Sequence, residues 1–144
     1  MFKEYPSNEI QTLRLAAEKG SAEAQFHLGE CYLTCQGVAQ DYAEAVKWFK
    51  LAAEQRFAKA QNNLGVMYEN GECVVQDAAQ AVTWYRLSAE QGYAHARYRL
   101  GSMYTNGDGV LQNKFEAAKW FQLAAEQEFP GAQNALDSLH ISGY

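Results

Sequence analysis

The sequence predicts an all-α protein in which helix-turn-helix units of 36 residues stack into a solenoid. Two observations predict this fold. Within each interval of 36 residues the apolar positions follow helical spacing. A set of residues also recurs every 36 positions without a gap: Leu28-Gly29, Leu64-Gly65 and Leu100-Gly101, then Tyr32, Tyr68 and Tyr104, then Trp48, Trp84 and Trp120. A fixed period of about 20 to 50 residues is typical of stacked units that contact only their neighbours.

Composition and charge argue against several classes of protein. The chain has 144 residues, of which 48% are apolar, and a formal net charge of −5. We expect no nucleic-acid ligand, because phosphate binding needs a basic surface. We expect no membrane insertion, because no apolar run approaches the roughly 18 residues that a membrane helix needs.

The first residues and the cysteines bear on location. The opening stretch, MFKEYPSNEI, lacks the apolar core of a secretory signal. We therefore expect a cytoplasmic protein, or a periplasmic or secreted one if a signal peptide has been removed. Cys31, Cys35 and Cys73 are odd in number and lie at non-repeating positions, which favours a reducing compartment.

Residues 5–21 are predicted to form an N-terminal half-unit that caps the array. Pro6 suits the start of a helix, where its missing N–H costs little, and the helix is expected from Ser7 to Lys19. Thr12 stands where the full units have tryptophan. The smaller, polar side chain fits the end of a solenoid, which has no neighbour to cover it.

Each full unit is predicted to begin with a helix whose apolar face has the spacing i, i+4, i+7, i+8, as in Ala24, Leu28, Cys31 and Tyr32. A glycine follows each leucine, although glycine inside a helix costs about 1 kcal/mol relative to alanine. We therefore expect another helix backbone to approach closely at the glycine. The units span residues 22–57, 58–93 and 94–129, and their first helices are expected at about 22–34, 58–70 and 94–106.

A loop and a second helix complete each unit. The loop contains glycine, which permits the left-handed backbone that ends a helix, and a valine (Val38, Val74 or Val110) expected to fix the loop to the core. Capping boxes then predict the helix starts: Asp41 with Glu44, Asp77 with Gln80, and Asn113 with Glu116. The second helices are expected at about 42–55, 78–91 and 114–127, with their tryptophans packed between helices.

Residues 130–144 are predicted to form a C-terminal partial unit. Pro130 opens a last helix over about 131–143 that matches the first helix of a unit. This helix is interpreted either as a cap or as the point where a longer array has been cut.

The repeating pattern is A-x-x-x-L-G-x-x-Y, then G-x-G-V, then D-x-x-x-A-x-x-W-x-x-x-A-A-E-x-G, and it resembles the Sel-1-like repeats, relatives of the tetratricopeptide repeats. The departures are Cys35 and Cys73 at loop glycine positions, and Arg56 and Glu128 where the second unit has Gly92. The resemblance covers three full units and implies a single right-handed α-solenoid whose concave face is lined by the first helices. It implies a protein-binding adaptor or scaffold rather than a catalyst.

Some cysteine-rich members of the family have been linked to β-lactam binding. The alternatives are therefore a small-ligand-binding or hydrolytic protein, or a fragment of a longer repeat array. The sequence contains no Ser-x-x-Lys, Gly-x-Ser-x-Gly or His-Glu-x-x-His motif and no phosphate-binding loop. We expect no enzyme activity and no cofactor.

One helix carries a candidate set of metal ligands, His27, Cys31 and Cys35. Successive members of this set would lie about 6 Å apart and the outer two about 12 Å apart along the helix, which is too far to share one ion. We expect no metal and interpret Cys31 as a small buried thiol. A disulfide between Cys31 and Cys35 is the alternative in an oxidising setting.

Positions on the first helices that differ between units are free to serve a partner, and in tetratricopeptide-like stacking they face the concave groove. Asparagine and arginine side chains there suit a peptide backbone or a carboxylate, while Phe26 and Tyr98 offer apolar anchors. We expect a protein or peptide ligand and a monomer, with weak dimerisation as the alternative. The predicted partner-binding residues are Phe26, His27, Glu30, Lys59, Asn62, Asn63, Val66, His95, Tyr98, Arg99, Ser102 and Asn134.

Overall fold

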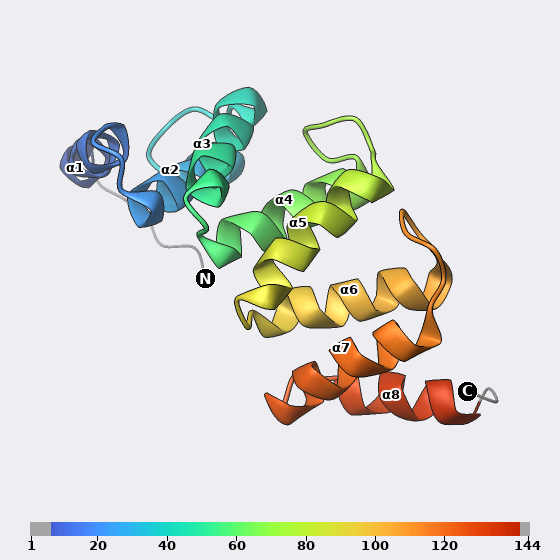
Figure 1. The fold of residues 1–144 in the computed structure, drawn as a ribbon. Coiled ribbons are helices and arrows are strands. Elements are labelled where there is room, and N and C mark those ends of the chain that lie inside the picture. Colours follow the sequence, from blue (N-terminus) through green and yellow to red (C-terminus); the bar gives the residue numbers. More distant parts are fainter. Residues whose placement is uncertain (1–6, 142–144) are drawn as a thin grey trace. The chain divides into compact units, whose positions relative to one another are not determined.

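The computed structural model describes residues 7–141 and confirms the all-helical fold of paired repeats (Figure 1). The predicted parts at residues 5–6 and 142–144, including Pro6, lie outside the described residues. Within residues 7–141 there are eight helices: α1 (Ser7–Glu18), α2 (Ala22–Thr34), α3 (Tyr42–Glu54), α4 (Ala58–Asn70), α5 (Ala78–Glu90), α6 (Ala94–Asn106), α7 (Lys114–Glu126) and α8 (Ala132–Ile141).

The helix bounds agree closely with the prediction. The first helices of the units, α2, α4 and α6, begin and end at the expected residues, and the second helices, α3, α5 and α7, end one residue earlier than expected. No helix in the described part of the chain is long and apolar enough to cross a membrane.

The chain forms two compact units, Met1–Leu64 and Gly65–Tyr144. In the first unit, α2 packs against α1 and α3, and Leu28, Cys31 and Phe49 are completely buried. In the second unit, α6 packs against α5 and α7, and α7 packs against α8 (Figure 1). Tyr85 and Leu100 are completely buried in the second core.

The repeated glycines face aromatic rings of the second helix of their unit. A Cβ atom at Gly65 would lie 2.5 Å from the ring of Tyr85, and one at Gly101 would lie 2.7 Å from the ring of Phe121. At Gly29 the nearest atoms are the Phe49 ring at 2.9 Å and the backbone oxygen of Ala45 at 3.3 Å, so the second helix approaches with both ring and backbone. The ring of the second helix fills the space that a side chain would need.

The helices α3, α5 and α7 begin at the predicted caps. Of the two hydrogen bonds of a capping box, only the one accepted by the side chain of the cap residue forms. The side chains of Asp41, Asp77 and Asn113 accept hydrogen bonds of 3.1 Å from the backbone N–H three residues later. The backbone N–H of each cap donates to a tyrosine carbonyl of the preceding helix, as from Asp41 to Tyr32 at 3.0 Å. The carboxylate of Glu44 instead accepts from Nε1 of Trp48 at 3.1 Å. The cap thus ties the second helix to the first.

Four residues other than glycine adopt the left-handed backbone in the described part of the chain, residues 7–141. Cys35 and Cys73 have φ of 60° and 64°, and Arg56 and Glu128 have φ of 68° and 60°. Gly92, at the position that matches Arg56 and Glu128, has φ of 95°. These turns therefore keep the left-handed backbone even where the residue is not glycine.

The tryptophans and valines are buried to different degrees. Trp48 and Trp120 are 7% and 6% exposed, whereas Trp84 is only half-buried. The valines Val38, Val74 and Val110 are also half-buried, and Val110 packs against the second core as expected. In the middle repeat the adjacent Tyr85 is the fully buried ring.

Candidate functional site

In the compact unit Met1–Leu64, the side chain of Phe26 lies in the core rather than on the surface. Its exposed fraction is 6%, and its ring lies 5.2 Å from that of Phe57 and 5.7 Å from that of Phe49. The predicted anchor is buried, so it supports the face from beneath and offers a partner little surface. The burial of Phe26 was not predictable from the first helices alone, because Phe57 lies in the connection between two 36-residue repeats.

Beside Phe26, the face of α2 is acidic, as the sequence indicates. His27 Nδ1 lies 3.0 Å from Glu30 Oε1, and His27 Nε2 lies 3.7 Å from Glu23 Oε1. Burial, with a smaller contribution from Glu30, raises the pKa of the Cys31 thiol to about 11. Within residues 7–141, no group of three or more His, Cys, Asp and Glu side chains is arranged to hold a metal ion.

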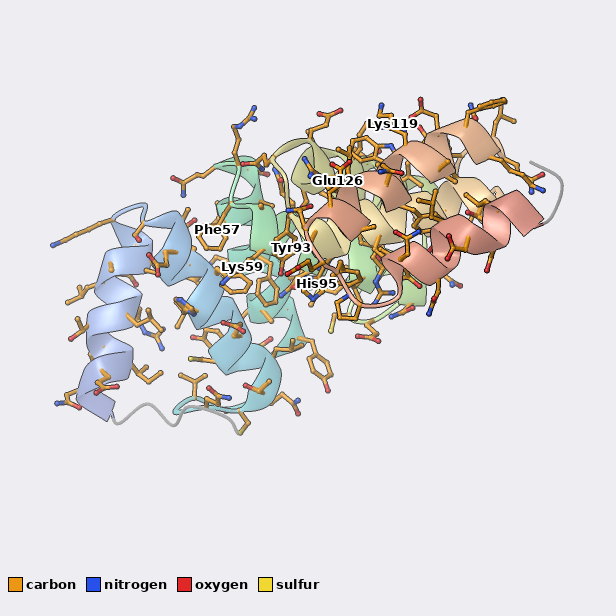
Figure 2. The ribbon with its side chains drawn as sticks, turned by 90° about the horizontal axis from the view of Figure 1, so that it is seen from below. Phe57, Lys59, Tyr93, His95, Lys119 and Glu126 are labelled. Carbon is orange, nitrogen blue, oxygen red and sulfur yellow. The ribbon has the colours of Figure 1, made fainter. Side chains whose placement is uncertain are left out.

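The predicted residues of α4 differ in accessibility. Lys59 is exposed near the start of the helix, close to Phe57 in the chain (Figure 2). Asn63 is half-buried, and Asn62 is 8% exposed with a buried Oδ1 that has no hydrogen-bond partner in the described structure. Val66, which belongs to the second unit, packs against its core.

In the second unit, Arg99 is part of a network. Its Nη1 lies 3.8 Å from Glu69 Oε2, and Glu69 Oε1 accepts a hydrogen bond of 2.8 Å from the Tyr85 hydroxyl. Burial and the neighbouring Glu69 carboxylate raise the pKa of Tyr85 far above its usual value, although Arg99 acts in the opposite direction. Arg99 remains half accessible, with 44% of its side chain exposed.

An aromatic cluster covers the end of α6 where the helix begins. The rings of Tyr93 and His95 stack at 5.3 Å (Figure 2). The ring of Phe129 lies 4.7 Å from that of His95 and 5.1 Å from that of Tyr98. Tyr98 also lies 5.5 Å from Phe121. These contacts hold Tyr98 in a fixed, half-buried position.

A hollow of about 390 Å³, lined in part by Tyr98, lies in the compact unit Gly65–Tyr144. It brings together two predicted residues, Tyr98 and Ser102, but not Asn134, which is exposed on α8. Its lining residues come from α6, the following loop, α7 and α8: Tyr98, Ser102, Thr105, Asn106, Gln112, Lys114, Phe121, Ala135, Ser138 and Leu139.

Sequence reasoning missed the polar residues on the loop side of this hollow, above all Lys114. A signal was present in the sequence. The matching positions in the other two 36-residue repeats are Tyr42 and Ala78, so the positive charge is unique to the third repeat, residues 94–129.

Three stretches of the chain, residues 22–57, 58–93 and 94–129, match the family model described as Sel1 repeat. These are the same intervals as the units defined by the period of 36 residues. No curated protein matches the chain.

Solved structures share the fold. A protective antigen present in uropathogenic Escherichia coli strains, which displays an SLR fold, is 42% identical with a TM-score of 0.89, and the match covers 93% of this chain and 29% of the antigen. The chain thus spans less than a third of that antigen's length. A Sel1 repeat protein from Oxalobacter formigenes is 34% identical with a TM-score of 0.87, and the match covers 91% of this chain and 98% of that one. Helicobacter pylori cysteine rich protein B, at 18% identity and a TM-score of 0.72, shares the fold alone.

Proposed function

The chain belongs to the Sel1 repeat family, and on this premise we propose that it is a non-catalytic adaptor that binds a protein or peptide on the exposed faces of its first helices. The observation that carries the proposal is the hollow between α6 and α8, because its lining includes Tyr98, Ser102 and Lys114, which differ from the residues at the matching positions of the other repeats. Its size is in the range of ligand-binding clefts, about 300–1,000 Å³.

The distribution of burial along α6 supports this face. The positions that recur in every unit, such as Ala96 and Leu100, are completely buried. The positions that vary, His95 and Arg99, are exposed. The recurring residues therefore form the core, while the varying ones are available to a partner. This face presents aromatic rings and an arginine. Aromatic and arginine side chains are enriched among the residues that dominate the binding energy of protein interfaces.

The ionisable groups with shifted pKa values support a binding role rather than catalysis. Cys31 has its pKa raised to about 11, so its thiol stays protonated and a weak nucleophile at neutral pH. The Tyr85 hydroxyl also stays protonated and is engaged with Glu69. Both groups belong to the helix packing.

A matched pair of charge reversals tests the proposal. Arg99 and Lys119 each lie near a glutamate, at 3.8 and 3.6 Å, and are 44% and 55% exposed. Lys119 is on α7, and Figure 2 shows it and His95 on opposite sides of the second unit. In affinity capture from a lysate of the source cell, Arg99→Glu should lose a specific protein that both the unmodified chain and Lys119→Glu retain. Equal capture by all three chains, or no specific capture by any, would contradict the proposal.

The proposed adaptor acts as a monomer in the cytoplasm. The support for this location is the odd number of cysteines, of which Cys31 is free and buried and Cys35 and Cys73 are free and exposed. Exposed thiols persist in a reducing compartment, whereas an oxidising one would pair or modify them.

A further inference from the structure

We propose that the hollow in the second unit binds a peptide segment in which an apolar side chain lies next to a carboxylate, and that Lys114 and Asn106 select the carboxylate. This inference rests on the proposed function, because the hollow is part of the proposed peptide-binding face. It adds the chemistry of the ligand and two residues outside the predicted set.

The floor of the hollow suits an apolar side chain. Ala135 and the ring of Tyr98, which are both half-buried, offer most of its apolar surface, and Phe121 and Leu139 complete the lining. Phe121 is 3% exposed and Leu139 is 3% exposed, so both are fixed parts of the core rather than mobile surface groups. An apolar side chain that enters the hollow would remove this surface from water, which is favourable.

The hydroxyl groups around this floor face a ligand as acceptors. Thr105, Ser102 and Ser138 each donate to the backbone carbonyl four residues earlier, at 2.8, 3.2 and 2.9 Å. The Gln112 amide donates to the Thr105 carbonyl at 2.8 Å. Because these hydrogens are already engaged, the donors left for a ligand are the Lys114 ammonium, the Asn106 amide, the Tyr98 hydroxyl and the second hydrogen of the Gln112 amide, and of these only Lys114 is charged.

The charge of the lining points to an anionic ligand. Among the described residues that line the hollow, Lys114 is the only charged one, and within residues 7–141 it makes no ion pair. It is the first residue of α7, where the helix dipole also favours a negative charge. A chain with a net charge of −5 thus presents an isolated positive charge beside an apolar floor. A carboxylate complements an ammonium and an amide donor placed together.

The carboxylate could come from an acidic side chain or from the end of a peptide chain, and three synthetic peptides separate these sources. The first ends in Leu-Phe with a free carboxylate, the second is the same peptide with an amidated end, and the third is amidated but has Glu after Leu-Phe. Binding is measured by NMR titration of the whole ¹⁵N-labelled chain, followed at the amides of residues 98–114.

The free-acid peptide, the Glu peptide or both should bind at least about tenfold more tightly than the amidated Leu-Phe peptide, as expected for one charge-assisted hydrogen bond. Lys114→Met should remove this preference, Lys114→Arg should keep it, and Lys119→Met should leave it unchanged. Which acid is preferred identifies the source of the carboxylate. Equal binding of acid and amide, a preference that survives Lys114→Met, or no titration shifts at residues 98–114 would overturn the inference.

The failure of this inference is distinguishable from failure of the proposed function. Partner capture that depends on Arg99 but is unchanged in Lys114→Met would leave the adaptor proposal intact and overturn the role of the hollow. Loss of capture in both Arg99→Glu and Lys114→Met, with Lys119→Glu unchanged, would support both.

Discussion

The hydroxyl of Tyr85 donates a hydrogen bond of 2.8 Å to the carboxylate of Glu69. Tyr85 is completely buried on α5, and Glu69 lies in the last turn of α4. Arg99 on α6 lies 3.8 Å from the second oxygen of the same carboxylate. One carboxylate therefore links three helices of the second unit, and it places a core residue in contact with the proposed binding face.

Tyr85→Phe should lower the free energy of unfolding by about 1–3 kcal/mol, because the partly buried Glu69 carboxylate loses a donor. The ring itself fits, since Phe49 and Phe121 occupy the matching positions in the other units. Urea unfolding measures the change, with Tyr42→Phe as the control, because Tyr42 is 51% exposed. Equal stability of the Tyr85 variant and the unmodified chain would show that the hydrogen bond is not stabilising.

Gly65→Ala should destabilise the protein by roughly 1–3 kcal/mol, although alanine favours helices, because the new Cβ would lie 2.5 Å from the Tyr85 ring. Thermal unfolding followed by circular dichroism measures the effect. Gly101→Ala should behave in the same way through Phe121. A rise in melting temperature for either variant would mean that the ring moves aside readily and that the glycine is not required for packing.

Arg56→Gly and Glu128→Gly should each stabilise the protein by roughly 0.5–1 kcal/mol. An L-residue in the left-handed region costs about 1–2 kcal/mol, which is more than the roughly 0.5–1 kcal/mol of extra entropy that glycine loses on folding. The reverse change, Gly92→Ala, should be destabilising, since Gly92 has φ of 95°. Chemical unfolding of the three variants tests this; a loss of stability in both glycine variants would contradict it.

Stability should fall as the pH rises through about 9 to 11. The pKa of Cys31 is raised from 9.0 to about 11 by burial, so in this window the unfolded thiol loses its proton while the folded one keeps it. Tyr93 and Tyr85 also have raised pKa values and act in the same direction. Cys31→Met, which installs the residue found at Met67, should reduce the slope of stability against pH by up to about 1.4 kcal/mol per pH unit. An unchanged slope would contradict the assignment of Cys31.

The period of 36 residues made most of the fold predictable, because three copies in one register average out local ambiguity. Asp41 and its equivalents marked the helix starts to the residue, since a short polar cap leaves few other positions for the first turn. The partner of Gly65 was not predictable in the same way. Sequence shows that space is needed at that glycine, but a ring and a backbone are equally consistent with it.

The candidate site was only partly predictable. Comparison between units identifies residues that are free to vary, and it found Tyr98 and Ser102. It also selected Phe26, because variation does not distinguish an exposed side chain from one whose buried neighbours have changed with it. Lys114 required knowing that α6, the start of α7 and α8 line one hollow, which depends on packing between elements rather than on spacing along one helix.

Hydrogen–deuterium exchange of the chain, free and bound to a protein that it captures through Arg99, tests the central claim most directly. Exchange should slow on binding over α6 and α8 and should change little around Lys119 on α7. Protection confined to α3, α5 and α7, with α6 and α8 unchanged, would place the partner on the second helices and contradict the account.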